Sequence, residues 1–247
     1  MTRKRDPLAD VRVLLAPSGR LHVGLVRGSP LSILGDPITP DPRGVGYEMG
    51  RALAHRLEVP MAPVLLTRPA EVLTELREQR IDIAFPALPA GRVTDLVFTS
   101  AFLQVDLGYL VAAGVRVRYV NDMDRPDLRI GVAAGGTEQL LLAARLREAR
   151  IVPVPSAAAA MTMLAGGKID AFAGDKPLLA RLSEPLPGTR MVDGSWGVAR
   201  VAAGLHASRE GGLAFVQQFV TSAQSEGLVE RAAQEAGLRG PFLPTAR

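Results

Sequence analysis

The sequence predicts an α/β protein of two similar lobes, each a mostly parallel sheet flanked by helices, with a ligand cleft between the lobes. Short apolar runs typical of strands alternate with segments whose apolar residues recur at helical spacing, an order that produces parallel sheets. Part of this order occurs twice. Residues 128–133 (LRIGVA) repeat residues 21–26 (LHVGLV), and residues 167–175 (GKIDAFAGD) repeat residues 79–87 (QRIDIAFPA).

The composition is that of a globular chain and excludes several classes of site. The 247 residues are 47% hydrophobic and 22% charged, enough to bury a substantial core. Arginines are scattered and aromatic residues make up 4%, so no nucleic-acid surface is expected. The chain has no cysteine, and His22, His55 and His206 lack metal-ligand spacing. We therefore expect no metal and no cofactor.

The first half of the chain shows a strand–helix rhythm. Residues 21–26 form a predicted strand, and the glycines and prolines of residues 27–42 indicate a loop. The next elements are a helix over 46–57, a strand at 64–66, a helix that begins at Pro69 and a third strand in RIDIAF (80–85).

The second half repeats this rhythm and then crosses back. Leucines of a helix (140, 141, 142 and 146) follow the strand at 128–133, Ser156 caps a further helix, and residues 167–175 include the last strand of the repeat. Residues 198–206 form a predicted strand, and the amphipathic helices at 213–223 and 228–236 are expected to pack on the first lobe. This order predicts a discontinuous first lobe (1–112 and 199–247), a second lobe (113–198) and hinges near Val111–Gly114 and Trp196–Val201.

Two charged residues mark the predicted cleft. Arg92 and Asp175 each follow the Ile-Asp strand of one lobe, and ligands bind outside the carboxyl ends of parallel strands. An Arg fork can hold a carboxylate with two parallel hydrogen bonds. Gly135 and Gly136 open a helix whose first N–H groups suit an anion, and Thr137 is also a candidate N-cap. The alternatives are a solvated loop Arg and an exposed turn Asp.

A family resemblance covers most of the chain. RLHVGLV, PRGVGYEMGRALAHRLEVP, GRVTDLVFTSAF, LRIGVAAGGTEQL and GGKIDAFAGDKPLLARL resemble, in order and spacing, the extracellular solute-binding proteins of family 3. That family contains amino-acid receptors of ABC importers and has the type 2 periplasmic-binding-protein fold. The resemblance implies that Arg92, six residues before Phe98, holds the ligand α-carboxylate, that Gly135, Gly136 and Thr137 add hydrogen bonds to it, and that Asp175 pairs with the α-ammonium. Leu31 and Leu88 complete the candidate ligand contacts, and no residue is predicted to be catalytic.

Three departures from the family pattern affect the predicted pocket. Arg92 lies ten positions after Asp82, a spacing two residues shorter than in the usual amino-acid receptor. Leu31 stands where an aromatic residue usually stacks on the ligand, and Ala101 and Phe102 replace a Pro and a Tyr. The prediction is therefore a solute binder for a small carboxylate that is amino-acid-like, with an altered pocket.

The resemblance implies an importer receptor that closes about its hinge, is monomeric, is not an enzyme and has a membrane permease as partner. It also implies a periplasmic location, although Asp6, Asp10 and Arg12 interrupt any signal-peptide stretch and leave a cytoplasmic location open. One alternative is an enzyme like cyclohexadienyl dehydratase on the same fold. Its required acid after the second-lobe Asp is absent, and Glu138, in a helix first turn, has an ordinary structural role there. The other alternative is a cytoplasmic small-molecule sensor.

Overall fold

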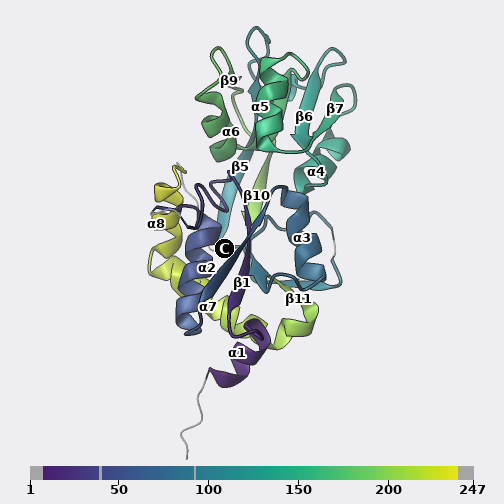
Figure 1. Cartoon of the computed structure of the whole chain (residues 1–247). Coiled ribbons are helices and arrows are strands. Elements are labelled where there is room, and N and C mark those ends of the chain that lie inside the picture. The colour runs from purple at the N-terminus through teal and green to yellow at the C-terminus, as the bar shows by residue number, and fades with distance from the viewer. Residues whose placement is uncertain (1–7, 39–40, 92, 239–247) are drawn as a thin grey trace, which may run out of the picture.

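In the computed structural model, residues 8–38, 41–91 and 93–238 are described, and their strands form two sheets with helices packed around each (Figure 1). The first sheet has the order β2-β1-β3-β11-β4. β1 pairs in parallel with β2 and β3, while β11 is antiparallel to β3 and β4. Its strands are β1 (Leu21–Val26), β2 (Met61–Leu66), β3 (Ile83–Ala84), β4 (Leu96–Phe98) and β11 (Gly204–His206).

The second sheet has the order β10-β5-β8-β6-β7, with β9 also paired to β5. β6 is parallel to β7 and β8, and β5 is antiparallel to β8, β9 and β10. Its strands are β5 (Leu103–Val111), β6 (Arg129–Ala133), β7 (Arg150–Val154), β8 (Ala171–Asp175), β9 (Arg190–Met191) and β10 (Gly197–Val201). The predicted α/β architecture of two lobes is confirmed.

Helices cover both sheets, as the amphipathic patterns predicted (Figure 1). The first lobe carries α1 (Ala9–Leu15), α2 (Val45–Arg56), α3 (Pro69–Arg77), α7 (Leu213–Ser225), α8 (Leu228–Glu235) and the 3₁₀ helix η2 (Ala207–Gly212). The second carries α4 (Thr137–Arg145), α5 (Ala157–Ala165), α6 (Lys176–Ser183) and the 3₁₀ helix η1 (Val120–Asp122). Among the described residues, no helix combines the length and apolar character needed to cross a membrane.

The C-terminal helices complete the first lobe. Phe219 and Val220 of α7 and Val229 of α8 are buried in the same core as Met49 and Leu53 of α2. α7 and α8 contact both each other and α2. Because these apolar faces cover one another, the prediction that both helices pack on the first lobe is confirmed.

The internal repeat has a structural cause, which is an aspartate that clamps the start of the first strand of each unit. Asp82 donates its N–H to the carbonyl of His22 (2.8 Å) and accepts the His22 N–H on its carboxylate (2.7 Å). Asp170 makes the same two bonds with Arg129, each at 2.8 Å. The repeated Ile-Asp pair thus satisfies backbone groups where β1 and β6 begin.

A glycine in each of these strands is required by the Ile beside that aspartate. A Cβ at Gly24 of β1 would overlap Cδ1 of Ile81, and a Cβ at Gly131 of β6 would lie 2.6 Å from Cδ1 of Ile169. Such distances are far below van der Waals contact, so a side chain at either position would displace the buried Ile. The shared His/Arg-x-Gly spacing of the two units therefore reflects the same packing in both lobes.

The chain crosses between the two sheets twice, and the crossings are bonded to each other. The Thr99 N–H donates to the carbonyl of Ala203, and the Ala203 N–H donates to the Thr99 hydroxyl, both at 3.0 Å. Phe102 donates its N–H to the Val201 carbonyl at 2.9 Å. Beyond these crossings, all of β5, from Leu103, pairs with strands of the second sheet. The lobe boundaries at 112/113 and 198/199 and the hinges near Val111–Gly114 and Trp196–Val201 stay predictions.

One local expectation needs correction. The strand expected over 80–85 reduces to Ile83–Ala84, because Asp82 turns its N–H to His22 and the chain leaves the sheet at Phe85. Of the leucines in α4, only Leu142 is fully buried, whereas Leu140 is 67% exposed and Leu141 lies at the surface of the cleft described below.

Candidate ligand-binding cleft

A cavity in two compartments lies between the lobes. The smaller compartment, of about 140 Å³, is lined from the first lobe by the segment after β1, the start of α3 and the end of β3, and from the second by the turn before α4 and the end of β8. Most of these segments follow the carboxyl ends of parallel strands, where ligands of α/β sheets bind. The larger compartment, of about 510 Å³, is also lined by strands β5 and β10 and by the loop that follows β3. Ala87, Thr137 and Glu138 line both compartments.

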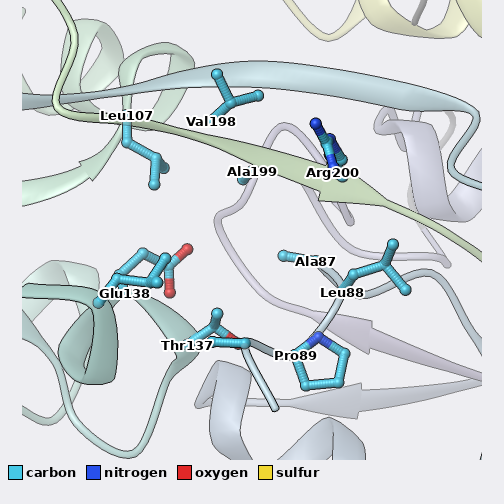
Figure 2. Close-up of a pocket in the computed structure, with 11 residues that line it drawn as sticks. Ala87, Leu88, Pro89, Leu107, Thr137, Glu138, Val198, Ala199 and Arg200 are labelled. Carbon is cyan, nitrogen blue, oxygen red and sulfur yellow. The ribbon is translucent and has the colours of Figure 1, made fainter. Parts of the chain in front are cut away.

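The structure brings most of the predicted ligand contacts to this cleft. Leu31, Gly135, Gly136, Thr137 and Asp175 line the smaller compartment. Leu88 lines the larger one, which Thr137 also reaches (Figure 2). The predicted carboxylate anchor, Arg92, lies outside the described residues.

The loop that carries Leu88 is held in place by one of the crossings. The Leu88 N–H donates to the carbonyl of Arg200 at 2.7 Å, and the Ala202 N–H donates to the carbonyl of Pro86 at 3.1 Å. These bonds satisfy backbone groups of the chain after Ala84, where the strand pairing of β3 ends. The loop after β3 therefore forms one wall of the larger compartment, facing Thr137 and Glu138 across it (Figure 2).

The glycine turn before α4 is partly satisfied by its own helix. The Gly135 N–H donates to Oε1 of Gln139 at 2.7 Å, so this donor is already engaged. Gly136 is the N-cap, and its extended backbone makes Thr137 the first helical residue. Thr137 is thus not the N-cap, and its hydroxyl has no hydrogen-bond partner within the described residues. A free hydroxyl at a helix start is a suitable donor to a ligand anion.

Asp175 is buried, which excludes an exposed turn Asp. It ends β8 and caps α6, where its carboxylate accepts the Leu178 N–H at 2.8 Å. The side chain of the adjacent Lys176 instead pairs with Asp106 of β5 at 3.2 Å. Burial raises the pKa of Asp175 to about 6, and the negative charge of Glu138 adds to the rise.

Glu138 is a cleft residue whose importance the sequence did not show. Figure 2 shows its carboxylate directed into the larger compartment, between Leu107 and Thr137. Burial raises the pKa of Glu138 as well. Its position directly after Thr137 was the available signal, but an acidic residue in a first helical turn is common for purely structural reasons. Arg200, an exposed residue that lines the larger compartment, was also missed.

The chemistry of the cleft is that of a small polar solute site. It offers the carboxyls of Glu138 and Asp175, the hydroxyl side chains Ser29, Ser32 and Thr137, the guanidinium of Arg200, and apolar walls. Within the described residues, no three His, Cys, Asp or Glu side chains gather as a metal site would require. Apolar walls with a few convergent polar groups are typical of small-molecule sites between domains.

Solved structures share this architecture. An amino acid ABC transporter substrate-binding protein from Streptococcus pneumoniae, bound to L-arginine, is similar with a TM-score of 0.77 and 18% identity, over 90% of this chain and 98% of that one. The solute receptor for L-cysteine of Neisseria gonorrhoeae has a TM-score of 0.78 and 18% identity, over 93% and 92% of the two chains. The chain has the type 2 periplasmic-binding-protein fold.

Another structure with this fold has a history relevant to the enzyme alternative. It is an ancestral amino acid-binding protein described as a precursor of cyclohexadienyl dehydratase, with a TM-score of 0.77, 19% identity and coverage of 93% of this chain and 99% of that one. No protein-family model and no curated protein sequence matches the chain. The fold implied by the sequence resemblance is therefore confirmed by structure, at low sequence identity.

The raised pKa of Asp175 predicts that asparagine at this position stabilises the protein. An acid whose pKa is raised by folding binds its proton more tightly when folded, so its contribution to stability falls as the pH rises from about 4 to about 6. Asparagine keeps an oxygen for the Leu178 N–H and removes the charge. We expect Asp175→Asn to raise the free energy of unfolding by about 1–3 kcal/mol at pH 8 and by little at pH 4, as measured by urea unfolding.

A control of opposite sign is available in the same lobe. The carboxylate of Asp124 accepts the N–H groups of Arg147, Glu148 and Ala149, and these bonds lower its pKa. Asp124→Asn should therefore be less stable than wild type at pH 8, and this difference in the free energy of unfolding should shrink at acid pH. A lower stability of Asp175→Asn than wild type at pH 8 would contradict the burial argument.

Proposed function

We propose that the protein is a solute-binding protein of an ABC-type importer that binds a small amino-acid-like solute in the cleft between its lobes. The observation that carries the proposal is the buried carboxyl of Asp175 facing a cavity whose walls come from both lobes. Asp175 would hold the solute ammonium. Thr137 would donate to the solute carboxylate together with Arg92.

Binding from both lobes also supports the hinge. A ligand that contacts Leu31 of the first lobe and Thr137 of the second favours the closed arrangement by the free energy of those contacts. The crossings near Thr99 and Ala203, which hydrogen bond to each other, would then rotate together. A membrane permease as partner, a periplasmic location and a monomeric state form part of this proposal.

A thermal-shift screen tests the proposal directly. We expect an amino acid, but not the hydroxy acid with the same side chain, to raise the melting temperature, because only the former carries an ammonium for Asp175. At a concentration 100 times its Kd, a ligand stabilises the native state by about 2.7 kcal/mol. For a chain of this size, that is a rise of roughly 5–10 °C.

Solution scattering on the best compound provides a second measurement. The radius of gyration should decrease on binding if the lobes close. A compound that binds tightly without compaction would count against the hinge, and equal shifts from the hydroxy acids would count against an ammonium-bearing solute.

The dehydratase alternative is favoured by one observation, the partly buried Glu138 near Asp175 in a cleft where both carboxyls have raised pKa values. A carboxyl with a raised pKa is a candidate general acid. Incubation with prephenate or arogenate, followed by analysis of the products, tests it. We expect binding without turnover, and product formation that Glu138→Gln abolishes would establish the enzyme instead.

A further inference from the structure

Glu138 lies where the two compartments of the cleft meet. It is shared by both, as are Ala87 and Thr137, whereas Asp175 belongs only to the smaller compartment. A solute whose ammonium reaches Asp175 and whose body extends into the larger compartment must therefore pass Glu138. The carboxylate reaches into that space (Figure 2), with Oε2 beside Gly136 at the start of α4.

Neither cleft carboxyl has an ion-pair partner among the described residues. The nearest lysine in sequence, Lys176, pairs with Asp106. Arg200 lies across the larger compartment from Glu138 and is exposed (Figure 2). The negative charge of Glu138 opposes ionisation of Asp175, which is buried, whereas Glu138 itself is partly buried. A cavity with this arrangement favours positive charge in its occupant.

One ammonium neutralises only one of the two carboxyls. A neutral amino acid with its ammonium at Asp175 leaves Glu138 either ionised without a partner or protonated, and both states cost free energy in a closed cleft. A second positive group on the solute removes this cost. The walls of the larger compartment suit such a solute, because Leu88, Leu107 and Val198 can pack against a methylene stem that leads to a charged end.

We propose that the cleft selects an amino-acid-like solute with a second positive group, and that Glu138 is the specificity-determining contact for that group. This inference rests on the proposed function. The charge of the solute, rather than its length, then decides affinity. Asp175 recognises what all such solutes share, and Glu138 recognises what distinguishes the basic ones.

Pairs of compounds with nearly the same shape test this inference by calorimetry. Arginine is compared with citrulline, and lysine with norleucine, on the wild-type protein and on Glu138→Gln. We expect wild type to bind the charged member of at least one pair about tenfold or more tightly than the neutral one. In Glu138→Gln, that ratio should fall to about three or less, while the affinity for the neutral member is kept or improved.

A matched variant controls for net charge. Glu148 is exposed on the same lobe and does not line either compartment, so Glu148→Gln removes one charge without touching the cleft. It should leave the ratio of the two affinities unchanged.

Three outcomes would contradict these proposals. An unchanged affinity ratio in Glu138→Gln, with a native circular dichroism spectrum, would overturn the role of Glu138. Tighter binding of citrulline and norleucine by wild type would overturn the selectivity but leave the proposed function standing. Failure of all four compounds and of other amino acids would refute the proposed function itself.

Discussion

Alanine in place of Arg92 is expected to weaken binding of a carboxylate-bearing solute by about 2–5 kcal/mol, because the ligand carboxylate would be desolvated without its charged partner. The residue is proposed as the anchor from its place after the Ile-Asp strand of the first lobe and from the family resemblance. Calorimetry with the best ligand from the screen measures the loss. Arg92→Lys should recover only part of it, since an ammonium cannot form the two parallel bonds of a guanidinium.

Two further variants show whether the loss is specific. Arg200→Ala removes another arginine, one that lines the larger compartment. It should weaken binding of the carboxylate-bearing solute less than Arg92→Ala does. Asp175→Ala should weaken binding as much as Arg92→Ala does if the solute carries an ammonium. It should leave affinity unchanged or improve it if the solute is a plain carboxylate. Wild-type affinity in Arg92→Ala would refute the site.

Alanine in place of Asp82 is expected to lower the free energy of unfolding by about 3–5 kcal/mol, because it leaves the buried guanidinium of Arg209 without its charged partner. Asp82 is 3% exposed, and its carboxylate pairs with Arg209 at 2.8 Å. The same carboxylate also bonds the N–H and the ring Nδ1 of His22. Arg209 also donates to the carbonyl of Leu14, and its Nε finds no hydrogen-bond partner in the part of the chain that the structure describes. Urea unfolding measures the change.

The repeat supplies the matched control. Asp170 clamps Arg129 as Asp82 clamps His22, but its pair is more exposed, with 39% of the Arg129 side chain open to solvent. Asp170→Ala should therefore cost only about 1–2 kcal/mol, since water can solvate the arginine that is left. Equal losses in the two variants would mean that the backbone clamps, and not the burial of Arg209, determine the stability.

The order of strands and helices could be predicted because it depends on local chemistry. Alternating apolar runs, prolines and glycines indicated β1, α2, α3 and β6, and the cap by Ser156 is present, with its hydroxyl accepting the Ala159 N–H at 3.1 Å. Strand RIDIAF was predicted too long, because the tertiary bond between Asp82 and His22 competes with strand pairing there.

The candidate site was only partly predictable. Residues after the strand ends, such as Leu31, Thr137 and Asp175, reach the cleft because topology places those ends together. The sequence did not show that Gln139 occupies the Gly135 N–H, or that Gly136 rather than Thr137 is the N-cap. Those outcomes depend on side-chain positions that no spacing encodes.

By itself, the sequence determined that the chain forms two α/β lobes with a repeated Ile-Asp strand, because the periodicity of apolar residues acts within short segments. Only the tertiary structure decided which charges are buried. Asp82 and Asp170 occupy equivalent positions, yet only Asp82 meets an arginine from η2. Glu138 follows an ordinary helix start, yet its carboxylate faces a cavity shared with the other lobe. Burial depends on what distant segments place beside a residue, and that sets both its pKa and the ligand it can hold.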